Sequence, residues 1–234
     1  MKRVILKISG EALANQSGSG INPKYIGKVA LEIKTLHDKG AQIGIVNGAG
    51  NMWRGRDAKA YGMPRTHADY MGMLGTIFNS LALQSALENL GLEVKVMSAL
   101  SVPAVAEDYN SRVAKKYLEE NKIVIFAGGT GSPFFSTDTT AALRAAEVNA
   151  EYILMAKNGV DGVYDSDPRK NANAKRYSHL SYDDMMNQHL EVMDLTAATL
   201  CRENDIKIVV FDMNVEGNIS KVYVDPSIGT LIEK

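Results

Sequence analysis

Short apolar segments alternate with longer amphipathic segments along almost the whole chain of 234 residues. The apolar segments are rich in β-branched residues and predict buried strands at 3–9, 41–46, 93–97, 122–127, 151–156 and 206–211. Predicted helices lie between them, at 22–40, 66–89, 111–120, 138–149, 181–189 and 194–204. Strands that are joined through helices pair in parallel, so the sequence predicts an α/β fold with a mostly parallel central sheet and helices on both faces.

The composition and charge of the chain exclude several classes of protein. The formal net charge is −1 and no long basic run is present, so we expect no nucleic-acid partner. No apolar stretch reaches the length of a membrane span, and the apolar run near the N-terminus is interrupted by Lys7, so we expect a cytoplasmic protein with no membrane partner. The single cysteine, Cys201, excludes an internal disulfide and is expected to be a packed thiol. The four histidines show no zinc-ligand spacing.

Ligands of parallel sheets bind beyond the carboxyl ends of the strands, so the residues after each predicted strand are the first candidates for a site. The first strand ends with Lys7, Ser9 and Gly10. A lysine within a buried strand is costly unless its ammonium group reaches a partner or an opening. The alternative interpretation is an edge strand whose lysine faces water.

The second strand leads into the sequence NGAGNMWRG at 47–55. Its small residues Ala49 and Gly50 would let a phosphate approach backbone N–H groups, and Arg54 would add a forked, two-point grip on that phosphate. The alternative is a tight turn that is followed by a surface arginine.

The strand at 122–127 leads into the sequence GGTGSPFFSTD at 128–138. Ser136 or Thr137 would cap the helix that begins at Asp138, and the N-terminus of a helix favours an anion.

Two phenylalanines of this segment, Phe134 and Phe135, follow the rigid Pro133 and would flank a flat ring. The alternative is a glycine turn with two core phenylalanines. Because two adjacent side chains cannot easily both face one core, we expect at least one ring to point at a cavity.

Two more candidate segments lie late in the chain. The sequence AKNGVDGVYDSDP at 156–168 contains two glycines that allow sharp turns, and it offers the ring of Tyr164 and the carboxylate of Asp167. Asp194 heads a predicted helix, where a carboxylate is a favourable cap, and capping alone is the alternative reading of this residue.

Together with Lys7, Arg54, Asp69 and Asp138, these loops favour a site for two phosphorylated groups. The sequence lacks the GxxxxGK[ST], HRD and DFG motifs, which argues against a P-loop NTPase and a protein kinase. Transfer from one phosphate to another needs no catalytic base, because the acceptor oxygen is already anionic. It needs positioning, cations and Mg²⁺, which agrees with the lack of a Ser-His-Asp set.

Six segments in the order KISGEAL, NGAGNMWRG, HADYMGML, GGTGSPFFSTDTTA, VDGVYDSDP and VMDLTA resemble the bacterial uridylate kinases (UMP kinases) of the amino acid kinase family. The resemblance runs from Lys2 to about Gly229, and TGSPFFSTD is its most specific part. It implies one domain over 1–234 with the amino acid kinase fold, a three-layer αβα sandwich. It also implies the reaction of ATP with UMP to give ADP and UDP, with Mg²⁺. The part at about 1–150 would bind UMP, and the part at about 151–234 would bind the ATP nucleoside.

The same resemblance implies a role for each candidate residue. Those implied to bind ATP are Lys7, Ser9, Gly10, Gly50, Arg54, Asn158, Tyr164 and Asp167. Those implied to bind UMP are Ala49, Asp69, Thr130, Gly131, Ser132, Pro133, Phe134, Phe135, Ser136 and Thr137. Those implied to serve catalysis are Lys7, Arg54, Asp138 and Asp194, of which Asp138 and Asp194 would also organise Mg²⁺ through the nucleotide. Ala49 and Asn158 replace a glycine and a threonine that are common in this family.

The resemblance further implies a homo-oligomer, a hexamer, that GTP activates and UTP inhibits. The segment 78–95 has few basic groups before Lys95, whereas an effector triphosphate would need several. The predicted helix at 66–89 has an apolar stripe that consists of Met71, Met73, Leu74, Ile77 and Leu81. Such a stripe is typical of a face that packs against the core. The resemblance also implies a dimer contact in this region.

Two other functions compete with this one. An enzyme of the same fold that phosphorylates a carboxylate or a carbamate would need neither the PFF segment nor the ribose-binding Asp69. A non-catalytic nucleotide sensor would have no need of Lys7, Asp138 and Asp194.

Overall fold

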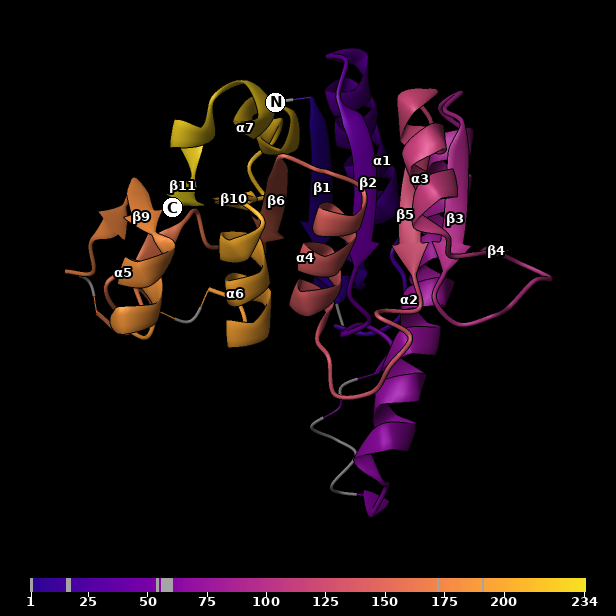
Figure 1. Ribbon diagram of the computed structural model, residues 1–234, viewed down its shortest axis with the longest axis horizontal. Helices are drawn as coiled ribbons and strands as arrows, with labels where there is room; N and C mark the ends of the chain where they lie inside the picture. The colour runs from indigo at the N-terminus through magenta and orange to yellow at the C-terminus, as the bar shows by residue number, and fades with distance from the viewer. Residues whose placement is uncertain (1, 16–17, 54, 56–60, 172, 191) are drawn as a thin grey trace.

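The structure is a computed structural model that describes residues 2–15, 18–53, 55, 61–171, 173–190 and 192–234. Nine strands of this described part form one sheet in the order β4-β3-β5-β2-β1-β6-β10-β11-β9, and helices cover both of its faces (Figure 1). All strand pairs in the sheet are parallel except β10 with β11. The predicted α/β sandwich with a mostly parallel sheet is therefore confirmed.

The strands of the sheet are β1 (Arg3–Ile8), β2 (Gln42–Asn47), β3 (Val94–Ser98), β4 (Glu107–Asp108), β5 (Ile123–Ala127), β6 (Tyr152–Lys157), β9 (His179–Ser181), β10 (Lys207–Asp212) and β11 (Thr230–Glu233). A separate antiparallel pair is formed by β7 (Val163–Tyr164) and β8 (Arg176–Tyr177). The helices are α1 (Pro23–Asp38), α2 (Arg65–Glu88), α3 (Ser111–Glu119), α4 (Thr137–Glu147), α5 (Tyr182–Asn187), α6 (Leu195–Glu203) and α7 (Asn218–Val224), with short 3-10 turns η1 (Gly10–Leu13) and η3 (Pro226–Ile228). None of the described helices is long and apolar enough to span a membrane.

The six predicted strands and six predicted helices are confirmed, with ends that differ by at most two residues. Local signals fix the start of α1: the side chain of Asn22 accepts a hydrogen bond from the N–H of Lys24, and Pro23 occupies the first turn. The sequence analysis missed β4, β7, β8, β9, β11 and α7. These elements are two to seven residues long, which is too short for a clear periodic pattern. They form because they pair with distant strands or pack against α1.

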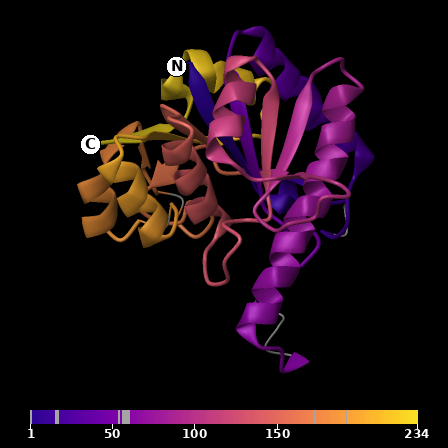
Figure 2. The same ribbon diagram turned by 45° about the vertical axis from the view of Figure 1, so that its right-hand side comes forward.

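The apolar residues of the strands divide between two cores, one on each face of the sheet. Successive side chains of a strand point to opposite faces, so Val4 and Leu6 of β1 pack with α1, α2 and α7, while Ile5 packs with α3, α4 and α6. Figure 2 shows the sheet between these layers, with α2 extending well beyond the body of the molecule. The alternation matters for function because Lys7 lies on the same face as Ile5, the face that α4 covers.

Candidate active site

Lys7 lies at the carboxyl end of a central strand and not at an edge. Its side chain is buried, and its Nζ atom lies 2.6 Å from Oδ1 of Asp138, in the first turn of α4. The water-facing alternative is therefore wrong, and the buried cation has the partner that its position requires.

The loops after β1 and β2 pack against each other through their backbones. A Cβ atom on Gly10 would lie 2.6 Å from the N atom of Gly50 and 2.7 Å from the O atom of Gly48, so only glycine fits there. The hydroxyl of Ser9 accepts a hydrogen bond from the N–H of Glu11 and caps η1. Arg54, which the sequence analysis placed in this loop, lies outside the described residues.

Buried amides hold the second of these loops in place. The side chains of Asn51 and Asn79 exchange hydrogen bonds of 3.0 and 2.8 Å, and Asn79 also donates to the carbonyl of Gly48. Asn79 is fully buried in α2. Sequence reasoning missed both asparagines, because neither shows a local signal for this long-range pairing.

A cavity of about 160 Å³ opens between α2, the loop after β2 and the N-terminus of α4. Of the residues that the sequence analysis assigned to UMP, Ala49, Asp69, Phe135, Ser136 and Thr137 line it, and so does Gly50. Residues 130–134 form the loop beyond this cavity and are not part of its wall. The cavity wall also includes Met73, Thr76 and Thr140, which the sequence analysis did not assign to a binding site.

The loop at 128–135 is fixed by unusual backbone conformations and by Asp69. Three of its glycines have positive φ, and so does Phe134, at 75°, which is costly for a bulky residue. The N–H of Phe134 donates to Oδ2 of Asp69 over 2.8 Å. Both phenylalanine rings are more than half exposed, so the interpretation as core residues is wrong. Phe135 faces the cavity, whereas Phe134 packs against the guanidinium group of Arg65.

Asp194 connects the N-termini of α4 and α6. Its carboxylate accepts hydrogen bonds from the hydroxyls of Ser136 and Thr139 and from the N–H of Ala197, so it is the N-cap of α6, as predicted. Burial alone would raise the pKa of Asp194, but the hydrogen bonds from Ser136, Ala197 and Thr139 lower it below its ordinary value. Ser136 in turn caps α4 through the N–H of Asp138.

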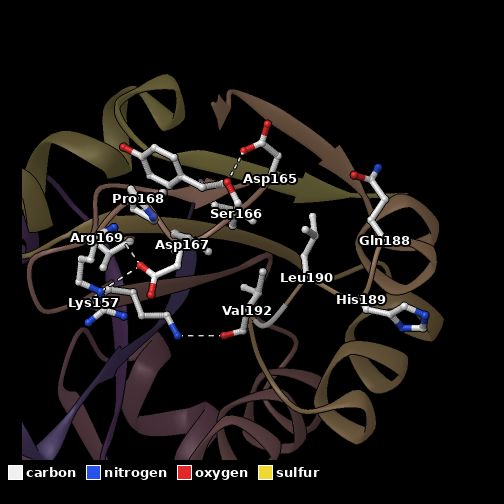
Figure 3. A pocket seen from close by; sticks show the side chains of 15 residues that line it. Lys157, Asp165, Ser166, Asp167, Pro168, Arg169, Gln188, His189, Leu190 and Val192 are labelled. Carbon is white, nitrogen blue, oxygen red and sulfur yellow. Dashed lines mark hydrogen bonds and ion pairs between the residues drawn. The ribbon is translucent and has the colours of Figure 1, made fainter. Parts of the chain in front are cut away.

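A larger cavity, of about 470 Å³, lies beside the end of β6 (Figure 3). Tyr164 and Asp167 line it, as the sequence analysis expected. Asn158 does not line it, because its side-chain oxygen accepts a hydrogen bond of 2.7 Å from Asn214 instead. Backbone and side-chain hydrogen bonds from Arg169 lower the pKa of Asp167 below its ordinary value.

Lys157 is a residue of this larger cavity that the sequence analysis missed. It is the last residue of β6, and its Nζ donates to the carbonyl of Val192 over 2.9 Å. Burial, and then the charge of Lys7, lower the pKa of this ammonium group, while Asp138 raises it. The signal that would have found it is the one that singled out Lys7: a lysine at the carboxyl end of a buried strand.

The strand order places Lys7 between the two cavities. β1 lies between β2, whose following loop lines the smaller cavity, and β6, whose last residue lines the larger one. One cavity on each side of β1 thus accompanies a buried ion pair at the carboxyl edge of a parallel sheet, where ligands of such folds bind. This arrangement is that of an enzyme that transfers a phosphoryl group between two bound substrates.

The chain belongs to the amino acid kinase family, whose family model matches residues 2–212. Among its relatives, a uridylate kinase of Limosilactobacillus reuteri is 55% identical over 99% of this chain and 97% of its own length. The uridylate kinase of Pediococcus pentosaceus is 54% identical over 99% of this chain and 96% of its own length. The crystal structure of the Ureaplasma parvum UMP kinase matches with a TM-score of 0.96 and 42% identity, over 100% of this chain and 99% of that one. The Bacillus anthracis UMP kinase structure matches with a TM-score of 0.97 and 42% identity, over 99% and 96%.

Proposed function

We propose that this chain transfers the γ-phosphoryl group of ATP to UMP and so produces ADP and UDP for pyrimidine nucleotide synthesis. The observation that carries the proposal is the Lys7–Asp138 pair between two cavities. The full-length similarity to proteins named uridylate kinase supports UMP as the acceptor.

UMP occupies the smaller cavity in this proposal. Asp69 accepts a hydrogen bond from the ribose, as its position in the wall allows, and Phe135 covers the uracil ring. The N–H groups near Ala49 and the N-terminus of α4 face the UMP phosphate, and both are suited to an anion. The loop at Thr130–Pro133 closes over the nucleotide.

The ATP nucleoside occupies the larger cavity, where Tyr164 provides a ring face and Asp167 an acceptor. The phosphates extend toward Lys7 and the backbone of Ser9, Gly10 and Gly50. Arg54, which lies outside the described residues, would add a second cation to the phosphates near the junction. In this division, the part at about 1–150 binds UMP and the part at about 151–234 binds the ATP nucleoside.

The transfer step requires no base. A phosphate oxygen of UMP forms a bond with the γ-phosphorus, while the bond from that phosphorus to the β–γ bridging oxygen breaks and leaves its electron pair on ADP. Lys7 stabilises the charge on the transferring group, and Asp138 orients the Lys7 ammonium. Asp194 acts indirectly, by fixing the N-termini of α4 and α6 relative to each other.

The residues of the site fit a magnesium ion that is held mainly by the nucleotide. No cluster of three or more acidic, histidine or cysteine side chains occurs in the described ranges, and Mg²⁺ commonly binds through one or two carboxylates together with phosphates and water. Asp138 is the carboxylate that we propose for this role, and Asp194 would help to organise the ion through the nucleotide. When bound, Mg²⁺ neutralises part of the phosphate charge.

The exposed apolar side chains of α2 support an oligomer. Met73 and Ile77 of the predicted stripe are buried, whereas Met71 and Leu74 are exposed, together with Tyr70, in the N-terminal half of α2. We place a subunit contact there, within a cytoplasmic homohexamer that GTP activates and UTP inhibits. Light scattering would give the mass of the assembly, and titration with GTP and UTP would test the regulation.

The first experiment is ADP release from ATP and Mg²⁺ with each nucleoside monophosphate in turn, and with acetylglutamate and carbamate. We expect turnover with UMP only. Turnover with a carboxylate or carbamate would keep the fold and overturn the acceptor. Measurable UMP binding without turnover would favour the nucleotide sensor.

A further inference from the structure

Lys157 and Lys7 lie on the same face of the sheet, at the ends of two adjacent strands. β6 pairs directly with β1, with Lys7 opposite Met155. Ile153 and Met155 of β6 belong to the core on the α4 face, so the alternation of the strand places Lys157 on that face too. Two lysines at strand ends therefore approach one region from adjacent strands.

The charge of Lys157 is left without a close counter-ion. Its Nζ contacts a neutral acceptor, the carbonyl of Val192, and no carboxylate oxygen of a described residue lies within 4.0 Å of it. The side chain is half-buried, so its ammonium group is partly removed from water. A second cation near Lys7 in such a place is unfavourable on its own, and a bound polyanion would offset the cost.

The position of Lys157 favours a contact with the phosphates of the nucleotide rather than with its base. It lies on the wall of the larger cavity and ends β6, the strand next to β1, whereas Tyr164 and Asp167 come from the segment beyond β6. An ammonium group carries three N–H donors. One of them binds the carbonyl of Val192, and among the described residues no other acceptor bonds to this group, which leaves two donors for phosphate oxygens.

We propose that Lys157 binds the phosphates of ATP where they leave the nucleoside cavity and stabilises the negative charge on the departing ADP. The proposal rests on the proposed function and adds a residue to it. Lys7 acts on the group that is transferred, while Lys157 acts on the β-phosphate, whose oxygen receives the electron pair when the bond to the γ-phosphorus breaks. Lysine suits this role because a point charge follows a moving phosphate without a fixed bidentate geometry.

A purely structural role for Lys157 would be to hold the Val192 segment against β6. The two roles differ in the ligand that they affect, since a structural brace shapes the whole cavity and a phosphate-binding cation acts only on charged nucleotides. Titration calorimetry with ADP and with adenosine, each with and without Mg²⁺, therefore separates them.

For Lys157→Met we expect ADP to bind roughly 10- to 100-fold more weakly, as for the loss of a charge-assisted hydrogen bond, with adenosine affinity unchanged. Lys157→Arg should retain most of the ADP affinity, and Lys157→Gln should behave like Lys157→Met. The KM for UMP should stay within about twofold. Lys175→Met, an exposed lysine outside the cavity wall, is the matched control and should change none of these values.

Equal weakening of ADP and adenosine in Lys157→Met would overturn the proposal in favour of the structural brace, and so would unchanged ADP affinity. A variant that fails to fold is replaced by Lys157→Arg and Lys157→Gln, whose difference in ADP affinity decides the same question. The proposed function fails separately, through absence of UMP turnover in the unmodified chain. In that event a selective loss of ADP binding in Lys157→Met would still establish the phosphate contact.

Discussion

The Nζ atom of Lys7, at the end of β1, lies 2.6 Å from Oδ1 of Asp138, in the first turn of α4. Both side chains are largely removed from water, so the two charges face each other in a partly buried setting. This pair joins the carboxyl end of a strand, beyond which ligands of such sheets bind, to a helix N-terminus, which favours an anion. Its position makes it the centre of the proposed transfer reaction.

Lys7→Met should lower kcat by at least about 100-fold, because it removes a preorganised positive charge from the transferring group. UMP affinity should change little, since UMP is proposed to bind in the smaller cavity, on the β2 side of β1. Steady-state kinetics together with UMP titration would check this, with Lys28→Met on the exposed face of α1 as the control. Turnover near that of the unmodified enzyme would remove Lys7 from the mechanism.

Asp69→Asn should raise the KM for UMP by roughly 10- to 100-fold, because it removes a charged acceptor from the ribose. Asp69 also accepts the N–H of Phe134, so the variant loosens the loop over the same cavity. Kinetics with each substrate varied in turn would measure both KM values. An increase confined to the KM for ATP would contradict the placement of UMP.

Asn79→Ala should destabilise the protein by about 2–4 kcal/mol, since it leaves the carbonyl of Gly48 and the side-chain oxygen of Asn51 buried without the donor that Asn79 provides. Urea unfolding would measure the change. Asn89→Ala, at the exposed end of the same helix, should cost about 0.5 kcal/mol or less. In a double-mutant cycle, Asn51→Ala should cost much less in the Asn79→Ala background, and strictly additive effects would show that the pair does not couple.

Asp194→Asn should lower stability at pH 7 by roughly 1–2 kcal/mol, because the bonds from Ser136 and Thr139 lose their charged acceptor. Since the folded state lowers the pKa of Asp194, the unfolded chain takes up the proton first as the pH falls. The stabilisation is complete above the ordinary carboxyl pKa, near 4, and is lost as the pH falls through the lower folded pKa. The difference in urea midpoint between variant and parent should therefore shrink as the pH is lowered below the ordinary carboxyl pKa, and a constant difference would refute this origin.

Cys201 should react slowly with thiol reagents in the folded protein. Burial raises the pKa of its thiol to about 12, and the side chain is fully enclosed beside Tyr182 in the core under α6. At pH 8 we expect modification by a disulfide reagent at least about 100-fold slower than in denaturant, because the thiolate is both scarce and shielded. Fast labelling of the folded chain would mean that this core opens readily.

Prediction from the sequence succeeded where local pattern and local geometry decide the outcome. The strand at Lys7, the cap at Ser136 and the cap at Asp194 each have a signal within a few residues, and all three are present in the structure. The resemblance extended this to the family, which the comparisons confirm. The individual roles of the site residues stay predictions until they are tested.

The sequence by itself determined which segments become strands and helices, because alternation and capping act over neighbouring residues. Only the tertiary structure decided that β1 lies between β2 and β6, and hence that Lys7 lies between two cavities. The same strand order brings Lys157 to the larger cavity, and helix packing joins Asp194 to Thr139 and Asn51 to Asn79. These contacts join segments that are far apart along the chain, and their geometry depends on how the whole sheet and its two helical layers pack.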